Sequence, residues 1–376
     1  MSRILICTQS YYPYQNGVAE VTTNLAEQFV KNGHEVTVAT EAHIKRNKQI
    51  TLNGVNIISL DIKGNYLSGI KGNDVKNYIE LVLSNQFDLI NIHCAQIWVF
   101  DVLINYLAQI KTKVIFTSHG LSLINYEIFK DYKSQLEKGL QSVWKIVCLS
   151  AMLDDYNYYS GKFKNKLSVI PNGVHPEHLK YLSNKGIPEI KLRKQKYIIN
   201  VSNHNAAKNH SLFFEVSRRL RNQTFINIGN PNYVERFKIA KSFRIKSGCY
   251  YACTFKSLFH NNVILFKNLK RENVLSLLSN STLFLFTSRL EQFPIAILEA
   301  MALGIPWIST GVGNVKSLEG GLIYKDAEDA VQKIEYLLKD DKKYKELSLQ
   351  GMKAVEQKYT WNSIAKQYQH LFNNVM

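Results

Sequence analysis

Short apolar runs alternate with longer amphipathic stretches from the first residues of the chain onward. Residues 3–8 form one apolar run, which is followed by a turn-rich loop and by a helical pattern over residues 19–32. Further strand-length runs lie at residues 35–40, 89–93, 113–118, 145–149 and 166–170, with helical patterns at 74–84, 98–109 and 151–159. Continuous apolar strands separated by helices predict a parallel sheet that is covered by helices on both faces.

This rhythm stops between residues 171 and 196 and then starts again. The interruption contains Asn172-Gly173, Pro176 and Pro188 and a basic run, a composition typical of a linker. Beyond it, strands are expected at residues 197–201, 225–229, 263–266, 283–287 and 306–309, and helices at 210–221, 271–278, 294–303, 327–339, 342–357 and 362–374. With 376 residues the chain exceeds the usual size of one hydrophobic core. We therefore predict an α/β protein with two Rossmann-like domains, at residues 1–175 and 196–358, joined by a linker at residues 176–195.

Two α/β domains joined by one linker are expected to have parallel sheets that face each other across a cleft. In open parallel sheets, ligands bind beyond the carboxyl ends of the strands, so both domains can contribute loops to one site. No G-x-G-x-x-G follows an expected strand, and no G-x-x-x-x-G-K-[ST] occurs in the chain. These absences disfavour the usual dinucleotide site and the P-loop ATP site.

The five cysteines are Cys7, Cys94, Cys148, Cys249 and Cys253. Cys249 and Cys253 have the spacing of half a zinc site, but no second Cys or His pair at ligand spacing accompanies them in the sequence. Reduced thiols and no bound metal are therefore expected, which places the protein in the cytoplasm. The apolar start of the chain is too short for the core of a signal peptide, and no run is long enough to span a bilayer.

The formal net charge of +17 predicts attraction to an anionic partner such as nucleic acid, an acidic membrane face or a phosphorylated ligand. A lysine-rich composition of the source organism would explain the same charge. Nucleic acid is not expected as a partner, because the chain contains no recognisable module for it. Two basic clusters could instead attract the inner face of the cell membrane: Lys45, Arg46 and Lys48 in the first half, and Arg236, Lys238, Lys241, Arg244 and Lys246 in the second.

Residues 287–309 are the most informative stretch. Residues 288–293 form the loop after an expected strand, and Pro294 suits the first turn of the helix that follows. The free N–H groups of Ile295 and Ala296, together with the helix dipole, make an anion site suited to a diphosphate. Glu291 precedes this helix start and Glu299 lies about one and a half turns beyond it. Carboxylates there could bind vicinal sugar hydroxyls, although two exposed glutamates beside an ordinary capped helix would give the same pattern.

Glu291-x7-Glu299, followed by Ala300-Met301-Ala302-Leu303-Gly304-Ile305-Pro306, resembles the donor-site signature of retaining GT-B glycosyltransferases of family 4. The resemblance runs over nearly the whole chain. Its other parts are Tyr12-Pro13, Asn16-Gly17-Val18, Gly33-His34-Glu35-Val36, Thr117-Ser118-His119-Gly120, Ile170-Pro171-Asn172-Gly173-Val174, Lys208-Asn209-His210 and Tyr359-Thr360-Trp361. It implies the GT-B fold, with the last helix, residues 359–376, returning to the N-terminal domain.

The resemblance also implies a role for each matched residue. Glu299 would hold the ribose hydroxyls, and Glu291 would face the transferred sugar. Backbone amides at Phe293 and Ile295, on either side of Pro294, would lie near the sugar and the diphosphate. Lys208 would neutralise the diphosphate, Gly17 would allow close approach of the donor, and His119 would orient the sugar unless it is merely a structural histidine. No metal or other cofactor is expected, because lysine and a helix start carry the charge and no D-x-D motif lies in a loop; Asp154-Asp155 is expected on a solvated helix face.

The expected function is therefore transfer of a hexose-type sugar from a nucleoside diphosphate sugar to a glycan or lipid-linked glycan. The anomeric configuration would be retained, and the product would be a bacterial cell-surface polysaccharide or glycolipid. Where the family has an arginine before the lysine, this chain has Ser202-Asn203-His204-Asn205, and His204 could partly replace it. Two alternatives stay open: a GT-B nucleotide-sugar epimerase, and a catalytically silent partner subunit that binds the donor or a membrane.

Overall fold

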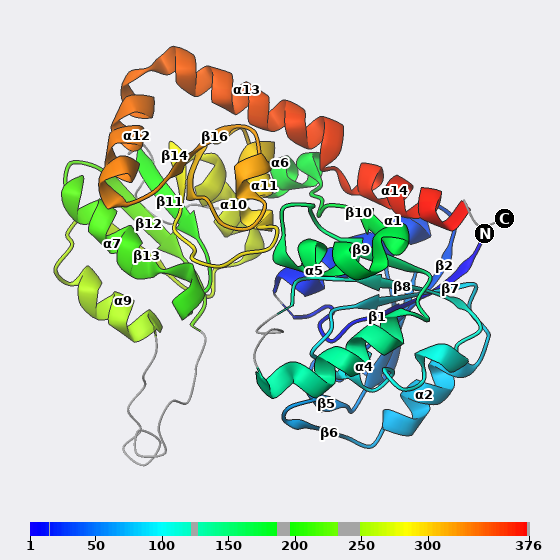
Figure 1. Ribbon diagram of the computed structural model, residues 1–376. Coiled ribbons are helices and arrows are strands. Elements are labelled where there is room, and N and C mark those ends of the chain that lie inside the picture. The colour runs from blue at the N-terminus through cyan, green and yellow to red at the C-terminus, as the bar shows by residue number, and fades with distance from the viewer. Residues whose placement is uncertain (15, 122–126, 186–195, 232–248, 374–376) are drawn as a thin grey trace. The chain divides into compact units, whose positions relative to one another are not determined.

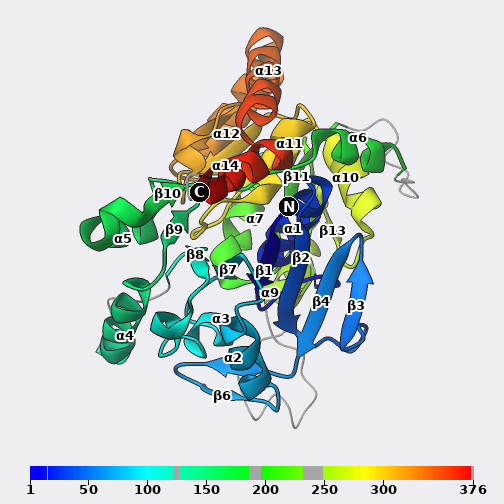
Figure 2. The same ribbon diagram turned by 90° about the vertical axis from the view of Figure 1, so that its right-hand side faces the viewer.

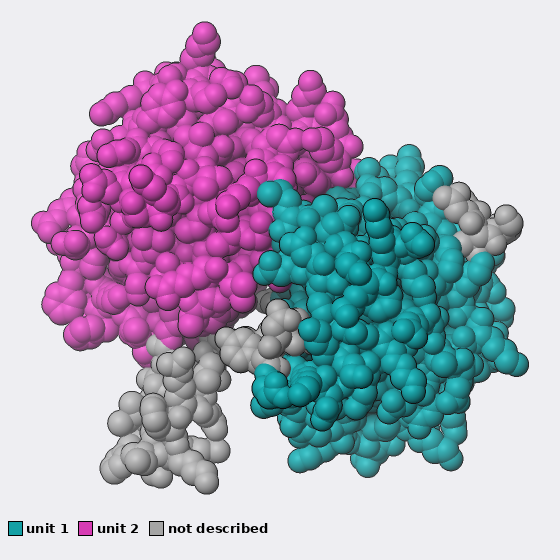
Figure 3. Space-filling view, viewed as in Figure 1, with its two compact units in different colours: residues 1–172, 361–376 teal, residues 173–360 magenta. Residues whose placement is uncertain are grey.

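The computed structural model describes residues 1–14, 16–121, 127–185, 196–231 and 249–373 of the chain. It divides into two compact units (Figure 3). Unit 1 contains residues 1–172 together with 361–376, and unit 2 contains residues 173–360. The last helix, α14 (Trp361–Asn373), therefore belongs to unit 1, which confirms that the end of the chain returns to the first domain.

Unit 1 is built on an eight-stranded sheet in the order β10-β9-β8-β7-β1-β2-β4-β3. The strands are β1 (Arg3–Cys7), β2 (Glu35–Glu41), β3 (Gln49–Leu52), β4 (Val55–Leu60), β7 (Leu89–His93), β8 (Lys113–Thr117), β9 (Lys145–Cys148) and β10 (Leu167–Val169). All neighbouring strands are parallel except β3 and β4. The central strands β1 and β7 are almost wholly buried, as their uninterrupted apolar sequences predict.

The antiparallel β3–β4 pair is a hairpin that the apolar pattern did not reveal. Asn53 and Gly54 form its turn, and both have positive φ angles, 51° and 80°. Asn-Gly is the preferred pair for such a two-residue turn, because its twist matches that of the strands. The dipeptide was therefore a usable signal for the hairpin. Two short strands, β5 (Lys63–Asn65) and β6 (Gly69–Lys71), form a second antiparallel pair.

Helices of unit 1 cover its sheet (Figures 1 and 2). They are α1 (Gly17–Lys31), α2 (Val75–Leu83), α3 (Trp98–Asp101), α4 (Lys130–Leu140), α5 (Asp154–Phe163) and α14. Helix α14 lies beside α1, where Phe29 packs edge to face against Tyr368 at 6.1 Å between ring centroids. The expected helix at residues 98–109 is wrong beyond α3, because only a short 3-10 turn, Leu107–Gln109, follows in that stretch.

Unit 2 contains a six-stranded, wholly parallel sheet in the order β13-β12-β11-β14-β15-β16. Its strands are β11 (Tyr197–Val201), β12 (Thr224–Ile228), β13 (Val263–Phe266), β14 (Leu283–Phe286), β15 (Trp307–Thr310) and β16 (Gly321–Tyr324). Its described helices are α6 (Pro176–Lys185), α7 (His210–Arg219), α9 (Cys249–Ser257), α10 (Arg271–Ser279), α11 (Ile295–Ala302), α12 (Ala327–Lys339) and α13 (Asp341–Lys358). The two parallel sheets agree with two Rossmann-like domains.

The expected linker at residues 176–195 is wrong in its first half. Residues 176–185 form helix α6, which packs against α10 and buries Leu179 and Ser183. Pro176 is the first residue of that helix, where its missing N–H costs nothing, so proline marked a helix start here rather than a break. Residues 186–195 lie outside the described part of the chain.

The first basic cluster is smaller on the surface than its sequence suggests. Arg46 is only 8% exposed. Its guanidinium donates to Ser59 Oγ at 2.9 Å and to the carbonyl groups of Tyr12 and Glu41. Lys48 pairs with Asp74 at 3.2 Å. The expectation of three free cations is therefore wrong at Arg46, because backbone carbonyls satisfy its donors. The second cluster, residues 236–246, lies outside the described residues. Among the helices that the structure describes, none is both long and apolar enough to cross a membrane.

Candidate active site

The loop that carries the donor-site signature, called the signature loop here, runs from the end of the buried strand β14 at Phe286 to Pro294. Pro294 takes the capping position of helix α11 with φ −73° and ψ 109°, so the helix begins one residue later, at Ile295. The first N–H groups of an α-helix have no partner within it. Those of Ile295 and Ala296 therefore point out of the start of α11, where the helix dipole favours an anion. The phenyl ring of Phe293 packs against Tyr359 at 5.9 Å, which fixes the last part of the loop.

Strand β15 and the loop after it hold the signature loop in place through hydrogen bonds to its backbone. Thr310 Oγ1 donates to the Ser288 carbonyl at 2.6 Å, and the Asn314 N–H donates to the Gln292 carbonyl at 3.1 Å. Gly313 has a φ of 55°, and a Cβ atom there would lie 2.6 Å from the carbonyl oxygens of Glu291 and Gln292. A glycine is therefore required for this close approach. The backbone around Glu291 is thus fixed by the fold before any ligand binds.

A second loop, which follows β11, brings Lys208 to the same place. Residues Ala206–Lys208 form a 3-10 turn, capped by the side chain of Asn205, which accepts from the Lys208 N–H at 3.2 Å. Thr287 Oγ1 donates to the Lys208 carbonyl at 2.9 Å, and the Arg289 N–H donates to the Ala207 carbonyl at 2.7 Å. These bonds join the two loops, because β11 and β14 are neighbours in the sheet and their carboxyl ends meet at one edge.

Lys208 and Glu291 form an ion pair between Nζ and Oε1. Both side chains are largely withdrawn from solvent, with 22% and 13% of their surfaces exposed. A lysine ammonium in such a position is a mobile point charge on a long stem, and it can turn from a carboxylate to a phosphate. The sequence predicted a role for each residue separately. The structure brings them together across 83 positions of the chain.

Glu299 lies on α11 and is only 4% exposed. It forms a two-point ion pair with Arg271, whose Nη1 lies 3.3 Å from Oε2 and whose Nη2 also contacts Oε1. The sequence analysis did not identify Arg271. It is the first residue of α10, and nothing in its local sequence distinguishes it from other surface cations. A fork-shaped arginine bond fixes the carboxylate in one orientation and leaves lone pairs of its oxygens for a further hydroxyl donor.

His204, offered by the sequence as a substitute for the missing arginine, does not fill that role. Its side chain is 1% exposed, and its Nδ1 lies 3.9 Å from Cys249 Sγ. A phosphate-binding side chain must reach the ligand, whereas this ring is enclosed by protein. The expectation is therefore wrong for this residue, and Lys208 is the cation that the structure places beside Glu291.

In unit 1, Gly17 is the first residue of helix α1 and lies on the surface. Asn16 caps this helix by accepting from the Ala19 N–H at 3.0 Å. A Cβ atom added to Gly17 would meet nothing within 4 Å, and its φ angle is not positive. None of the residues that the structure describes therefore demands glycine at this position. A ligand that approaches the helix start closely would explain it.

His119 follows strand β8 and contacts His93 at the end of the neighbouring strand β7, with 3.0 Å between His119 Nε2 and His93 Nδ1. Burial lowers the pKa of His119 to about 4. Burial also lowers the pKa of His93, and His119 adds to that effect. Both rings are thus neutral at pH 7, one donating and one accepting. His93 is 0% exposed and was not identified from the sequence. The sequence does not show that His93 lies opposite Thr117 in the sheet, which is what brings it near His119.

The loop after His119 is anchored by a residue that the sequence analysis placed on a solvated face. Asp155 is 2% exposed and accepts from Ser118 Oγ at 2.6 Å, so that expectation is wrong. The residue lies on the inner side of α5, where the helix covers the sheet. Burial raises the pKa of its carboxyl group. Asp155 therefore supports the backbone next to His119 and is not a metal ligand exposed to solvent.

Two family models match the chain: "Glycosyl transferases group 1" over residues 253–354 and "Glycosyltransferase Family 4" over residues 15–178. N-acetyl-alpha-D-glucosaminyl L-malate synthase of Bacillus anthracis is 21% identical over 97% of this chain and 96% of its own. Sucrose-phosphate synthase from Thermosynechococcus elongatus superposes with a TM-score of 0.75 at 17% identity, covering 100% of this chain and 99% of its own. The Anabaena protein HepE, solved with UDP and glucose, gives 0.73 at 14% identity over the full length of both chains.

These likenesses identify the fold as GT-B, with its two Rossmann-like domains. The two family matches together span more than half of the chain. One includes Glu291 and Glu299, and the other includes Gly17 and His119. The chain belongs to the group 1 glycosyltransferases of the family 4 type.

Proposed function

We propose that this glycosyltransferase moves a hexose-type sugar from a nucleoside diphosphate sugar to a hydroxyl group of a glycan or lipid-linked glycan, with retention of the anomeric configuration. The observation that carries the proposal is the Lys208–Glu291 pair beside the start of α11. A mobile cation and free helix N–H groups suit a diphosphate, and the neighbouring carboxylates suit sugar hydroxyls.

The chemistry that we propose needs a stabilised leaving group above all. As the sugar departs, negative charge grows on the nucleoside diphosphate. Lys208 would turn from Glu291 to that charge, and the N–H groups of Ile295 and Ala296 would bind it without rearrangement. Glu291, released from the lysine, would accept from hydroxyls of the transferred sugar. We propose no metal in this step, since these groups supply the positive potential.

Glu299 and Arg271 would hold the ribose end of the donor. The arginine would orient the Glu299 carboxylate so that it can accept from vicinal hydroxyls. His119, neutral because of burial, would orient the transferred sugar by a hydrogen bond rather than by proton transfer. The acceptor hydroxyl would then attack on the face from which the diphosphate leaves, its oxygen replacing the bond from the anomeric carbon to the diphosphate and its proton passing to the departing diphosphate oxygen, which retains the configuration without a covalent intermediate.

The names and bound ligands of similar proteins support this class of donor. One relative is named for an N-acetylglucosaminyl product, and HepE was solved with UDP and glucose. We propose synthesis of a bacterial cell-surface polysaccharide or glycolipid on the cytoplasmic side of the membrane. Peripheral attraction to anionic lipid remains part of this proposal, although burial of Arg46 removes one cation from its first cluster.

A panel of nucleoside diphosphate sugars tests the proposal by thermal stabilisation, since a ligand that binds only the folded state raises the melting temperature. We expect one or two sugar nucleotides to stabilise the protein, and Glu299→Gln to abolish the shift. Incubation of the stabilising donor with candidate acceptors should then release nucleoside diphosphate only when an acceptor is present. Release without acceptor would indicate an epimerase, and stabilisation without any release would indicate a silent partner subunit. No stabilisation by any member of the panel would contradict the proposal.

A further inference from the structure

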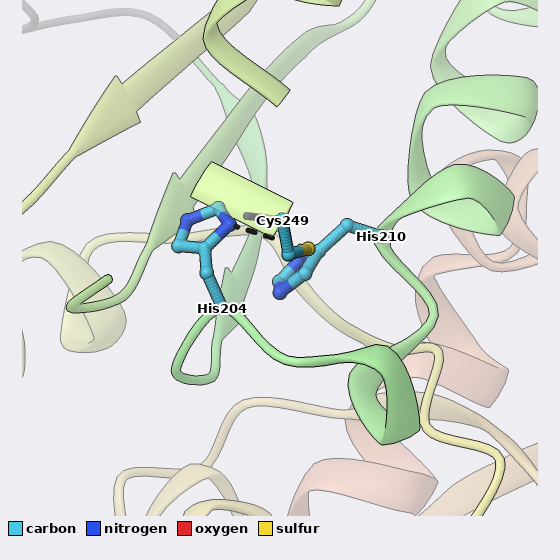
Figure 4. Close-up of side chains that lie close together, drawn as sticks. All are labelled: His204, His210 and Cys249. Carbon is cyan, nitrogen blue, oxygen red and sulfur yellow. Dashed lines mark hydrogen bonds between the residues drawn. The ribbon is translucent and has the colours of Figure 1, made fainter. Parts of the chain in front are cut away.

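Unit 2 contains a cluster of nitrogen and sulfur ligands that the proposed transfer reaction does not use. His204 lies in the segment after β11, His210 is the first residue of α7, and Cys249 lies in the first turn of α9 (Figure 4). One donor atom of each residue lies within 4.8 Å of those of the other two. Cys253, one turn further along α9, faces Cys249. The sequence showed only the two cysteines, because the histidines that complete the set lie about forty residues earlier and are brought near by the fold.

The separations within the cluster are close to those of a tetrahedral metal site. In a zinc site with Zn–S bonds of about 2.3 Å and Zn–N bonds of about 2.0 Å, two sulfurs lie about 3.8 Å apart and a sulfur and a nitrogen about 3.5 Å apart. Here the Sγ atoms of Cys249 and Cys253 are 3.8 Å apart, and Cys249 Sγ is 3.9 Å from His204 Nδ1. Cys249 is therefore at tetrahedral spacing from Cys253 and near it from His204, whereas Cys253 lies outside the group of three donor atoms that are mutually within 4.8 Å and would have to move towards the histidines. The two imidazole rings are stacked, with centroids 4.3 Å apart and an interplanar angle of 23°.

Burying these polar side chains costs free energy unless their nitrogen and sulfur atoms have binding partners. His204 is 1% exposed, His210 2% and Cys253 4%. The ring nitrogen of His204 that faces Cys249 is Nδ1, and its contact with that thiol is long, at 3.9 Å. His210 is held at Nδ1 by the Asn227 amide at 3.0 Å, while its Nε2 lies 3.4 Å from the Asn203 carbonyl. A metal would take the place of one of these two contacts, and the other would orient the ring, as contacts behind metal ligands commonly do.

The cavity beside the cluster and its donor set also suit a metal. A thiolate is the form that binds metal. His210, Cys249 and Cys253 line a cavity of about 220 Å³, which provides an entry path. With two imidazoles and two sulfurs, the donor set favours a soft or borderline cation and not Mg²⁺ or Ca²⁺.

We propose that His204, His210, Cys249 and Cys253 bind one zinc-type divalent cation. Four protein ligands leave no open position for substrate, so the ion is structural and takes no part in sugar transfer. The ion links helix α9 to the loop that contains Lys208. This lysine lies between the two histidines in the sequence. Metal binding would thereby fix the loop that presents the diphosphate-binding lysine. This consequence rests on the proposed function, whereas the site itself does not.

Cobalt(II) is the probe for the site. The protein, purified under reducing conditions and stripped with chelator, should bind one equivalent of Co²⁺ with a thiolate-to-cobalt charge-transfer band and the intense visible bands of tetrahedral cobalt. Zn²⁺ should displace it and remove the colour. We expect Cys249→Ser and Cys253→Ser to lose the charge-transfer intensity stepwise, and His204→Gln to weaken Co²⁺ binding at least tenfold. Cys94→Ser, which changes a free thiol of unit 1, is the matched control and should bind like the wild type.

Alkylation provides a second measurement on the unmodified chain, so the test does not depend on variants that fold. Bound Zn²⁺ should protect two of the five thiols from alkylation, and mass spectrometry should identify them as Cys249 and Cys253. Absence of a charge-transfer band in the wild type would overturn the proposal. Equal alkylation with and without Zn²⁺ would do the same, as would a Cys249–Cys253 disulfide that forms in place of metal binding. None of these readouts uses a sugar nucleotide, so failure of the metal site and failure of the proposed transferase would be distinguished.

Discussion

Unit 2 carries its candidate site residues as ion pairs, whereas unit 1 carries them as neutral groups. In unit 2, Lys208 pairs with Glu291 and Arg271 pairs with Glu299. In unit 1, His119 contacts His93 as one neutral ring to another. An ion pair can open when a charged ligand arrives, because each partner finds a new counter-charge. A neutral pair, here with His93 fully buried, has no such exchange available and stays fixed. Under the proposed function, unit 2 would neutralise the charge of the donor and unit 1 would position an uncharged group.

Lys208→Ala tests the charged side of this comparison and should have the largest effect. Removing the cation leaves growing charge on the diphosphate without its main partner, so turnover should fall by about a hundredfold or more. Steady-state kinetics against the wild type measure the loss. Lys339→Ala, an exposed lysine at the end of α12, is the matched control for loss of one positive charge.

A double variant separates the two consequences of losing that lysine. Lys208→Ala also leaves Glu291 unpaired, and its charge would repel the diphosphate. If repulsion contributes, Lys208→Ala combined with Glu291→Gln should be faster than Lys208→Ala alone. A near-normal rate for Lys208→Ala itself would show that the lysine does not serve the donor.

Glu299→Gln tests the second ion pair and should weaken donor binding by about 2–3 kcal/mol, or roughly 30- to 150-fold, through loss of charge-assisted hydrogen bonds. The amide keeps the shape of the side chain, so the fold should be preserved. Arg271→Ala should weaken donor binding less than Glu299→Gln does, because it removes only the group that orients the carboxylate. Calorimetry with nucleoside diphosphate measures both. Equal losses in the two variants would mean that Arg271 itself contacts the ligand.

Gly17→Ala tests whether unit 1 also meets the donor at close range. Alanine at the start of α1 should change the free energy of unfolding by less than about 1 kcal/mol, since its Cβ would meet none of the more distant described residues within 4 Å. The KM for the donor should nevertheless rise by about tenfold, because the methyl group occupies space reserved for the ligand. Gly161→Ala in α5 is the control, as a Cβ there also meets nothing within 4 Å. An unchanged KM in Gly17→Ala would leave this glycine without a role in the donor site.

The smallest effect is expected for the protonation of His119 between pH 8 and pH 5. Burial places its pKa near 4, so the ring stays neutral over this range. The folded pKa lies below that of an exposed histidine, about 6.5. Stability from this group is therefore complete above pH 6.5 and declines as the pH falls towards 4. The imidazole resonance in NMR spectra, assigned with His119→Asn, should not shift between pH 8 and 5. A titration near pH 6.5 would remove the contrast between the two units.

The sequence singled out individual candidate residues but not the side chains that they contact. Glu291, Glu299 and Lys208 could be named as candidates because the signature and the lysine motif are local. Their partners depend on strand order: Lys208 meets Glu291 because β11 and β14 are neighbours, and His119 meets His93 because β8 and β7 are. A linear pattern predicts strands, but it does not state which of them lie side by side.

Burial of polar side chains was the other gap. Arg46, Asp155 and His204 were all read from their polarity as groups that face solvent or ligand, and all three are enclosed. Each has partners that lie more than ten positions away, including Ser59 for Arg46 and Cys249 for His204. Buried polar groups need such partners. Because the partners come from distant segments, the sequence alone did not reveal them.

The return of α14 to unit 1 has a consequence for the order in which the protein is made. Unit 2 is one continuous segment, and its ends are tied together where the Val174 N–H donates to the Tyr359 carbonyl at 2.8 Å. Unit 1 is split, and Phe29 of its first helix gains the aromatic neighbours Tyr368 and Phe372 only from α14. During translation, unit 1 therefore cannot complete its fold before unit 2 is made. Its first helix stays incompletely covered until unit 2 has been synthesised. Loss of the last helix by a premature stop codon would destabilise unit 1, most of which is translated first.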